Sequence, residues 1–339
     1  MSVFNVANFL AQWDSTAAPA VQVSKPRQVH CWTKTSKDEG GQFCFGDESG
    51  LLPYKPPSLP ADLNAGFETA YTKKDDWEVS PVDTIIQAGT AAAVDWSKVG
   101  LCTYRNNLNK VLLTPVSLDN DWAVDACFWG GTLFLDINKA GNQEYPNQDK
   151  FVYYGYKFEA LCTGQDHVDS SSEFAVLVQY RLGSHSVLMA AEIDCAKEEG
   201  DGPDGGRPYV ELKTYKMPAH SRAVAIMYKD KHPRWWLQSF LAGVTTLVLG
   251  ARNHTGQLLK VHEVPVQLLL GLSANAGQAW DPNLLLGFGD SVLSWIAAAA
   301  QQQPGQQLLV SYSKDSREIH LEPAEDGSMA QRLAQLLPQ

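Results

Sequence analysis

The 339-residue sequence lacks the cysteine and histidine spacings that bind zinc. Its six cysteines are scattered without a C-x-x-C pair, and its eight histidines include no H-x-x-x-H pair. Scattered thiols with no disulfide pattern are typical of proteins in a reducing compartment. We therefore expect neither a zinc site nor a disulfide-stabilised secreted fold.

The sequence also has no segment suited to secretion or to crossing a membrane. The N-terminal stretch MSVFNVANFLAQWDS has no basic region followed by a long apolar core, which a signal peptide would have. The longest apolar run, residues 235–251, contains Gln238 and two glycines, and it is typical of a buried helix end followed by a strand. We expect no membrane association, and a location in the nucleus, the cytoplasm or both.

Positive charge is scarce overall but concentrated locally. The chain has 27 Lys and Arg against 38 Asp and Glu, a formal net charge of −11. This balance argues against non-specific wrapping of duplex nucleic acid. Residues 212–236 nevertheless hold six basic residues and one acid. A narrow basic channel that prefers a single strand is compatible with this distribution.

The patterns that are present predict one large α+β domain over residues 1–339. The hydrophobic fraction of 44% is ample for a large core. Residues 1–30 are interpreted as an arm containing a short helix or irregular structure, and the Pro-rich residues 51–63 as a surface loop. Predicted helices cover residues 80–93, 151–162, 234–244, 281–300 and 329–337, the first with Ser80 as N-cap and Pro81 at its first position.

The predicted strands lie between these helices. Residues 98–115 and 122–138 are interpreted as strands or as strand–helix–strand. Further strands are expected at 173–195, around a Gly183–Ser184 turn, and at 209–216. Hairpins are expected at 245–266, across Asn253–Gly256, and at 306–323.

Acidic side chains interrupt two of the apolar strand segments. Glu192 and Asp194 follow the apolar residues 186–191, and Glu211 and Lys213 lie within residues 209–216. Because side chains alternate along a strand, each pair shares a face, so pairing of the strands would bring three carboxylates and one ammonium together. A cross-strand salt bridge is one explanation. A site for Mg²⁺ or Mn²⁺ is the other, since hard cations prefer carboxylate, carbonyl and water oxygens.

Five segments, taken together, resemble the signature blocks of the DXO family of decapping exoribonucleases. They are TYRNNLNKVLLTP (103–115), GYKFE (155–159), EIDC (192–195), ELKT (211–214) and WWLQSFLAGV (235–244). The resemblance runs from about residue 50 to 260, with these motifs between residues 105 and 238. It implies large mixed β-sheets with flanking helices around a PD-(D/E)XK nuclease-like core.

The resemblance also implies a metal-dependent hydrolase that acts on single-stranded RNA 5′ ends. Such enzymes remove pyrophosphate from 5′-triphosphate RNA, remove unmethylated or incomplete caps and NAD caps, and degrade 5′-monophosphate RNA in the 5′→3′ direction. Some members stimulate a larger 5′→3′ exoribonuclease by binding it. We expect a monomer.

The resemblance assigns roles to particular residues. The implied metal ligands are Glu159, Asp194, Glu211 and the main-chain carbonyl of Leu212, while Glu192 would hold a metal-bound water or join a second ion. Two ions about 4 Å apart would stabilise the attacking and leaving oxygens. Contacts with substrate are implied for Lys213 and Gln238, which would position water and phosphate, for Arg105, which would clamp a non-bridging oxygen, and for Glu159 and Ser184.

Other interpretations of these residues stay open. Glu159 could be a solvated helix residue, Gln238 a capping residue, and Ser184 an ordinary turn residue. The chain also departs from the family pattern at Asn106, where a glycine is usual, and at Pro233, where we expect the helix that carries Gln238 to start afresh with Pro233 in its first turn. A catalytically weak binding protein and a PD-(D/E)XK DNA nuclease are the competing functions.

Overall fold

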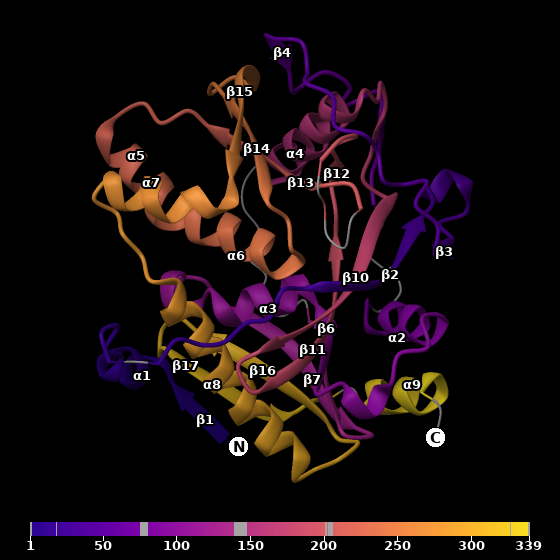
Figure 1. Cartoon of the computed structure of the whole chain (residues 1–339), viewed down its shortest axis with the longest axis vertical. Coiled ribbons are helices and arrows are strands. Elements are labelled where there is room, and N and C mark those ends of the chain that lie inside the picture. Colours follow the sequence, from indigo (N-terminus) through magenta and orange to yellow (C-terminus); the bar gives the residue numbers. More distant parts are fainter. Residues whose placement is uncertain are drawn as a thin grey trace.

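The fold is described from a computed structural model that covers residues 2–17, 19–74, 81–138, 148–200, 202, 206–325 and 327–337 (Figure 1). The predicted N-cap residue Ser80 and part of the loop at 200–208 lie outside these ranges. Within these ranges, most strands belong to two large sheets, and helices pack between the sheets and around them.

The larger sheet extends from β1 at the lower left of the molecule to β3 at its right-hand side in Figure 1. Its strand order is β1 (Ser2–Asn5), β17 (Glu318–Pro323), β16 (Gln307–Ser313), β7 (Trp122–Trp129), β8 (Thr132–Ile137), β6 (Leu101–Tyr104), β11 (His185–Glu192), β10 (Glu173–Leu182), β2 (Arg27–Lys34) and β3 (Phe43–Phe45). Strand β6 runs parallel to β8 and β11, and the other neighbours are antiparallel, so this sheet is mixed.

The smaller sheet lies above it. Its order is β12 (Cys195–Ala196), β13 (Tyr209–Lys216), β14 (Thr246–Arg252), β15 (Gln257–Pro265) and β4 (Ala61–Asp62). Strands β13 and β14 are parallel and the other pairs are antiparallel. A two-stranded parallel ribbon joins β5 (Tyr71–Thr72) and β9 (Val168–Asp169).

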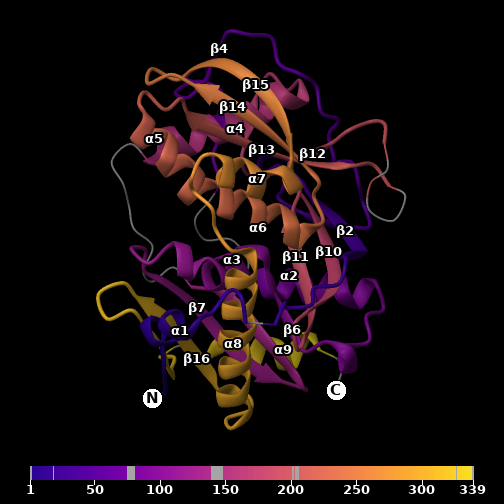
Figure 2. The same ribbon diagram turned by 60° about the vertical axis from the view of Figure 1, so that its left-hand side comes forward.

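The helices form layers over these sheets (Figure 2). They are α1 (Val6–Gln12), α2 (Pro81–Ala91), α3 (Arg105–Leu112), α4 (Gln148–Thr163), α5 (Ser221–Ile226), α6 (His232–Ala242), α7 (Leu269–Asn275), α8 (Pro282–Gln301) and α9 (Ser328–Leu336), with a π-helical segment η5 (Met227–Lys231) and short 3₁₀ turns at 37–39, 96–98, 114–116 and 266–268. One core cluster joins α3, α6 and α8 to both sheets. Helices α2 and α9 cover the opposite face of the larger sheet, and α4 covers the outer face of the smaller one.

Helix α8 is long and apolar enough to cross a membrane by length and composition alone. Half of its apolar window is buried inside the fold, where Leu285, Phe288, Val292 and Ile296 contribute to the core. A buried core helix of a globular domain has the same composition.

The α+β class with large mixed sheets is confirmed. Residues 98–115 form a strand and a helix, residues 122–138 form a hairpin, and the hairpins at 245–266 and 306–323 are present. The N-terminal arm is more ordered than expected, because β1 pairs with β17 at the edge of the larger sheet before the expected short helix begins. The assignment of residues 1–339 to one domain stays a prediction.

The helix that carries Gln238 does not start afresh at Pro233. Helical backbone runs without a break from α5 through η5 into α6, although Pro233 does lie in the first turn of α6, as expected. A proline has no N–H to donate to the preceding turn. The wider π-helical turn before it accommodates this loss, so the expected break is replaced by a change of helical pitch.

Candidate active site

The acidic residues predicted from the strand pattern meet where the two sheets approach each other. Glu192 ends β11, Asp194 immediately precedes β12, and Glu211 and Lys213 lie on β13. The backbone N–H of Leu212 donates a hydrogen bond to Asp194 Oδ2 at 2.6 Å. This bond ties the acidic loop after β11 to the middle of β13 and explains how two separate strand segments build one cluster.

Glu211 is the centre of the cluster, with only 1% of its surface exposed. Its carboxylate accepts hydrogen bonds from Arg105 Nη1 at 3.1 Å and Gln238 Nε2 at 2.7 Å, and Lys213 Nζ lies 2.5 Å from Oε1. Burial alone would raise the pKa of Glu211, but Arg105 and Lys213 outweigh it and hold this pKa below its usual value. The three donors come from α3, α6 and β13, so Glu211 connects three elements.

For the carboxylates of Glu159, Glu192 and Asp194, nearby positive charges do not outweigh the effects that raise the pKa. Burial, followed by the charges of Asp194 and Glu192, raises the pKa of Glu159 well above its usual value. Glu192 keeps an exposed side chain at the end of β11, and partial desolvation there, followed by the charges of Glu173 and Asp194, raises its pKa to about 7. Burial, followed by Glu211, raises the pKa of Asp194 to about 6. The site therefore has more negative charge than its lysine and arginine neutralise, and protons or added cations would stabilise so many close carboxylates.

The donor set suits a hard divalent cation. It consists of carboxylate oxygens together with the Leu212 carbonyl, which faces the same edge of β13 as the N–H that binds Asp194. Strand β12 pairs only with Tyr209 and Val210, so this edge is not covered by β12 at Leu212. In the described ranges no three acidic, histidine or cysteine side chains already surround one point. Instead, the Lys213 ammonium lies among the acids, 3.9 Å from Asp194 Oδ2.

A cavity of about 550 Å³ opens beside the acids. Glu159, Glu192 and Asp194 line it, together with residues of β2, α4 and β10. Glu173, which also lines it and raises the pKa of Glu192, was missed from sequence because an acid at the first position of an apolar strand is unremarkable. Lys74 lies 3.4 Å from Glu173 and partly neutralises it.

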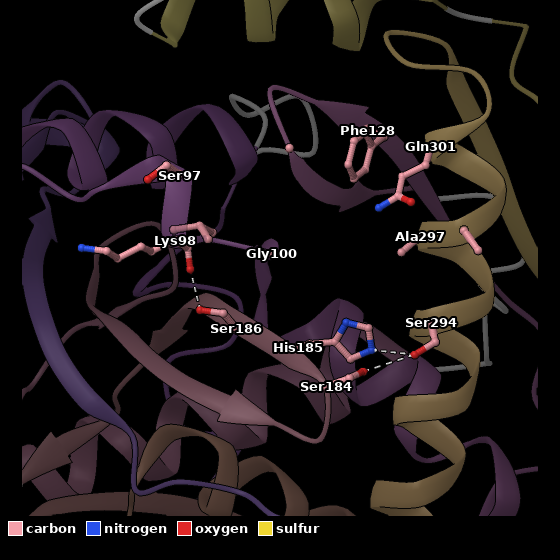
Figure 3. Close-up of a pocket in the computed structure, with 13 residues that line it drawn as sticks. Ser97, Lys98, Gly100, Phe128, Ser184, His185, Ser186, Ser294, Ala297 and Gln301 are labelled. Atoms are coloured by element: carbon pink, nitrogen blue, oxygen red, sulfur yellow. Dashed lines mark hydrogen bonds between the residues drawn. The ribbon is translucent and has the colours of Figure 1, made fainter.

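Ser184 is the predicted residue that the structure does not bring to this site. It lies in the β10–β11 turn, at the opposite end of the eight-residue β11 from Glu192 and so roughly 25 Å away. In Figure 3 it faces α8, where its Oγ donates to Asp290 Oδ1 at 2.9 Å and lies 3.4 Å from Ser294 Oγ. The expected phosphate contact is therefore corrected to a contact that fastens the turn to α8.

Asn106, the other departure from the family pattern, is harmless to the backbone. It is an exposed residue in the first turn of α3, next to the buried Arg105. A regular helical position does not require glycine.

The fold and the cluster of Glu159, Glu192, Asp194, Glu211 and Lys213 define a PD-(D/E)XK-type nuclease core. The model of the family described as "RAI1 like PD-(D/E)XK nuclease" matches residues 24–339. The chain belongs to this family, and it is an enzyme of the nuclease class.

Characterised relatives agree with this membership. The chain is 26% identical over 329 residues to the human decapping and exoribonuclease protein, covering 86% of this chain and 82% of that protein. It is 27% identical over 354 residues to the decapping nuclease din1 of Schizosaccharomyces pombe, covering 90% and 96%.

Solved structures share the fold. S. pombe Rai1 in complex with 3′-FADP superposes with a TM-score of 0.79 at 24% identity, covering 95% of this chain and 99% of that one. Candida albicans Rai1 in complex with pU5-Mn²⁺ gives a TM-score of 0.80 at 19% identity, with 94% of each chain covered.

Proposed function

We propose that this protein hydrolyses the 5′ ends of single-stranded RNA. Its substrates would be 5′-triphosphate RNA, RNA with unmethylated or incomplete caps, NAD-capped RNA, and 5′-monophosphate RNA, which it would degrade 5′→3′. The observation that carries the proposal is the acidic cluster around the buried Glu211, beside a cavity of about 550 Å³, in a member of this family. Curated relatives named as decapping nucleases and exoribonucleases support it.

A divalent cation, Mg²⁺ or Mn²⁺, would supply Lewis acidity and a low-pKa water at this site. Glu159, Asp194, Glu211 and the Leu212 carbonyl would hold it, and Glu192 would hold a second ion or a water. The four carboxylates support two ions, and relatives crystallised with Mn²⁺ or calcium support a divalent requirement.

Side chains around Glu211 would orient the substrate. Lys213 and Gln238 both contact Glu211 Oε1, at 2.5 Å and 2.7 Å, so small shifts of either would present a donor to a phosphate oxygen or to the attacking water. Arg105 contacts Oε2 of the same carboxylate at 3.1 Å, and its planar fork would reach a non-bridging oxygen while it keeps Glu211 in place.

We also propose that the enzyme acts as a monomer on newly made or defective transcripts in the nucleus or the cytoplasm. Binding to a larger 5′→3′ exoribonuclease would be an additional role.

The deciding experiment uses one RNA sequence with five 5′ ends: monophosphate, triphosphate, unmethylated cap, NAD cap and hydroxyl. Each RNA, and a DNA oligonucleotide of the same sequence, is incubated with Mn²⁺ and either the wild type or Glu192→Ala/Asp194→Ala. We expect pyrophosphate, cap nucleotide, NAD or mononucleotides to be released by the wild type only. Release from DNA alone would favour a DNA nuclease, and no product from any oligonucleotide would favour a binding protein.

Cation binding should depend on pH. Because the pKa values of Glu192 and Asp194 are raised to about 7 and about 6, a cation must displace protons below these values. We expect Mn²⁺ affinity, measured by calorimetry, to rise about tenfold or more from pH 5.5 to pH 7.5 and then level off. Glu192→Gln should flatten the upper part of this rise. Equal affinity at both pH values would contradict the proposed ligands.

The same shifts set the pH dependence of stability without cation. The ordinary pKa is 4.5 for Glu192 and 3.8 for Asp194. At a pH between each ordinary pKa and the raised one, the folded protein holds more protons than the unfolded chain. The free energy of unfolding of metal-free protein should therefore fall as pH rises from about 4 to 7. Added Mn²⁺ should offset this fall, because it binds only the folded state.

A further inference from the structure

A second cavity lies at the other end of β11 from the acidic cluster (Figure 3). Its volume is about 470 Å³, which is within the range of pockets that bind small organic ligands. Its walls come from four separate segments: the residues just before β6, the β7–β8 hairpin, the β10–β11 turn and α8. On α8, Ser294 and Gln301 are seven residues apart, so they lie on one face of the helix about 10 Å from each other. The proposed hydrolysis does not use this cavity.

His185 presents a hydrogen-bond acceptor to this cavity. Its Nε2 lies 3.3 Å from the main-chain oxygen of Asp290 and 3.2 Å from Ser294 Oγ. Because a carbonyl oxygen can only accept, Nε2 carries the hydrogen of the neutral ring, and Nδ1 keeps its lone pair. Nδ1 has no hydrogen-bond partner in the part of the chain that the structure describes, and in Figure 3 it points toward the cavity. The Ser184 N–H holds Asp290 Oδ1 at 2.9 Å, which fixes the groups behind the ring.

Phe128 and Gln301 lie across the cavity from His185 (Figure 3). The Phe128 ring is half-buried, and the exposed Gln301 amide beside it has no hydrogen-bond partner among the described residues. Between the two ends of the cavity, α8 contributes the small side chains of Ala297 and Ala298, which leave room for a planar ring. An amide offers a donor and an acceptor side by side, the pair with which glutamine binds N6 and N7 of adenine. An aromatic ring supplies a stacking surface for a base.

The cavity suits an uncharged ligand with hydroxyl groups. Among the described residues that line it, Lys98 is the only one with a fixed charge. Its ammonium lies 2.8 Å from Asp95 Oδ2 and points away from the cavity in Figure 3. The hydroxyls of Ser184 and Ser294 lie beside His185 and can exchange hydrogen bonds with the hydroxyls of a sugar. A planar heterocycle joined to a sugar, as in a nucleoside, therefore matches both ends of the cavity.

We propose that this cavity binds a purine nucleoside, with the base stacked on Phe128 and its edge bound by Gln301. The ribose hydroxyls donate to His185 Nδ1 at the other end. Adenosine is the best match, because its N6 amino group and N7 complement the two ends of a glutamine amide. A free nucleoside, a nucleotide and one residue of an RNA chain all present this chemistry. The inference does not depend on the proposed function, since the cavity is separate from the acidic cluster.

The test measures binding to the full chain by calorimetry in EDTA, so that no cation draws a ligand to the acidic cluster. The probes are adenosine, uridine, AMP and a ten-nucleotide RNA whose only adenosine is at its 3′ end. We expect adenosine to bind with a Kd of about 0.1 mM, the affinity that a typical ligand efficiency gives for about 19 non-hydrogen atoms. Uridine should bind about tenfold more weakly. AMP binding as well as adenosine would identify free nucleotides as ligands, and tighter binding of the oligonucleotide would identify RNA as the source.

Variants locate the binding to this cavity. Gln301→Ala should weaken adenosine binding about tenfold, and so should His185→Phe, which keeps a ring but loses the acceptor. The matched control is Gln303→Ala, which removes an exposed glutamine just beyond α8 and outside the cavity, and it should leave the affinity unchanged. Glu192→Ala/Asp194→Ala should also leave it unchanged, because these acids line the other cavity.

A further variant keeps the test decisive if His185→Phe fails to fold. Ala298→Trp fills the cavity from an exposed position of α8 without removing a hydrogen bond, so it should abolish adenosine binding in a folded protein. Thermal unfolding is measured for every variant. Absence of adenosine binding to the wild type at about 1 mM, or full affinity in both Gln301→Ala and Ala298→Trp, would overturn the inference. Neither result would affect the proposed hydrolysis of RNA 5′ ends.

Discussion

Glu211→Gln should lower metal-dependent hydrolysis about a thousandfold while the protein stays folded. Glu211 is the most buried acid of the cluster, and it accepts from Arg105, Lys213 and Gln238. Glutamine keeps the shape but loses the charge that would bind a cation, and its NH₂ group would meet an ammonium or a guanidinium. A loss of about 4 kcal/mol of transition-state stabilisation, the scale of a weakened Lewis acid, corresponds to this factor. Single-turnover rates with Mn²⁺ on triphosphate RNA measure it.

Mn²⁺ binding and a matched variant separate this effect from general damage. Calorimetry should show weaker Mn²⁺ binding to Glu211→Gln than to the wild type. Glu263→Gln removes a half-exposed acid of the same sheet, paired with Lys197 on the surface, and should leave the rate unchanged. A Glu211→Gln enzyme within tenfold of the wild-type rate and with normal Mn²⁺ affinity would show that Glu211 is not a metal ligand.

The alternation of side chains along strands predicted the central residues of the site. Glu211 and Lys213 had to share a face of one strand, and the acids of residues 192–194 had to be near the end of another. Alternation alone did not predict that these two segments lie next to each other. In the structure, the hydrogen bond from the Leu212 N–H to Asp194 connects them. Glu159 came from the resemblance alone, since one acid on an amphipathic helix looks like a solvated residue.

What could not be predicted depends on contacts between distant segments. Ser184 stands in a turn pattern that says nothing about which end of β11 lies near the acids, and its partner Asp290 is 106 residues away. The four residues of β1 are too few to show a period, and their place is decided by the free edge of β17. Local rules for proline predicted a break at Pro233, but packing of α6 between the sheets favours continuous helix with a π turn.

Arg105→Ala should lower the free energy of unfolding by about 3–5 kcal/mol in addition to slowing hydrolysis. The sequence suggested a residue whose main task is to bind phosphate. In the structure only 7% of Arg105 is exposed, and its Nη1 donates both to Glu211 at 3.1 Å and to the main-chain oxygen of Gln238 at 3.3 Å. Removing one partner of a buried ion pair leaves the other charge uncompensated, which costs this much in other proteins. Urea unfolding of metal-free protein measures the change.

The size of this change decides between two functions for Arg105. Lys314→Ala breaks a partly exposed ion pair with Asp121 at the surface and should cost less than about 1 kcal/mol, which provides the reference. Arg105→Lys keeps the positive charge but loses the planar guanidinium with its fixed donors. Compared with Arg105→Ala, it should recover most of the stability and little of the hydrolysis rate. If Arg105→Ala loses no more free energy of unfolding than Lys314→Ala but has lost its activity, Arg105 acts on the substrate alone. If stability and Mn²⁺ affinity fall together, Arg105 holds Glu211 in the position that binds the cation, and catalysis depends on it through that carboxylate.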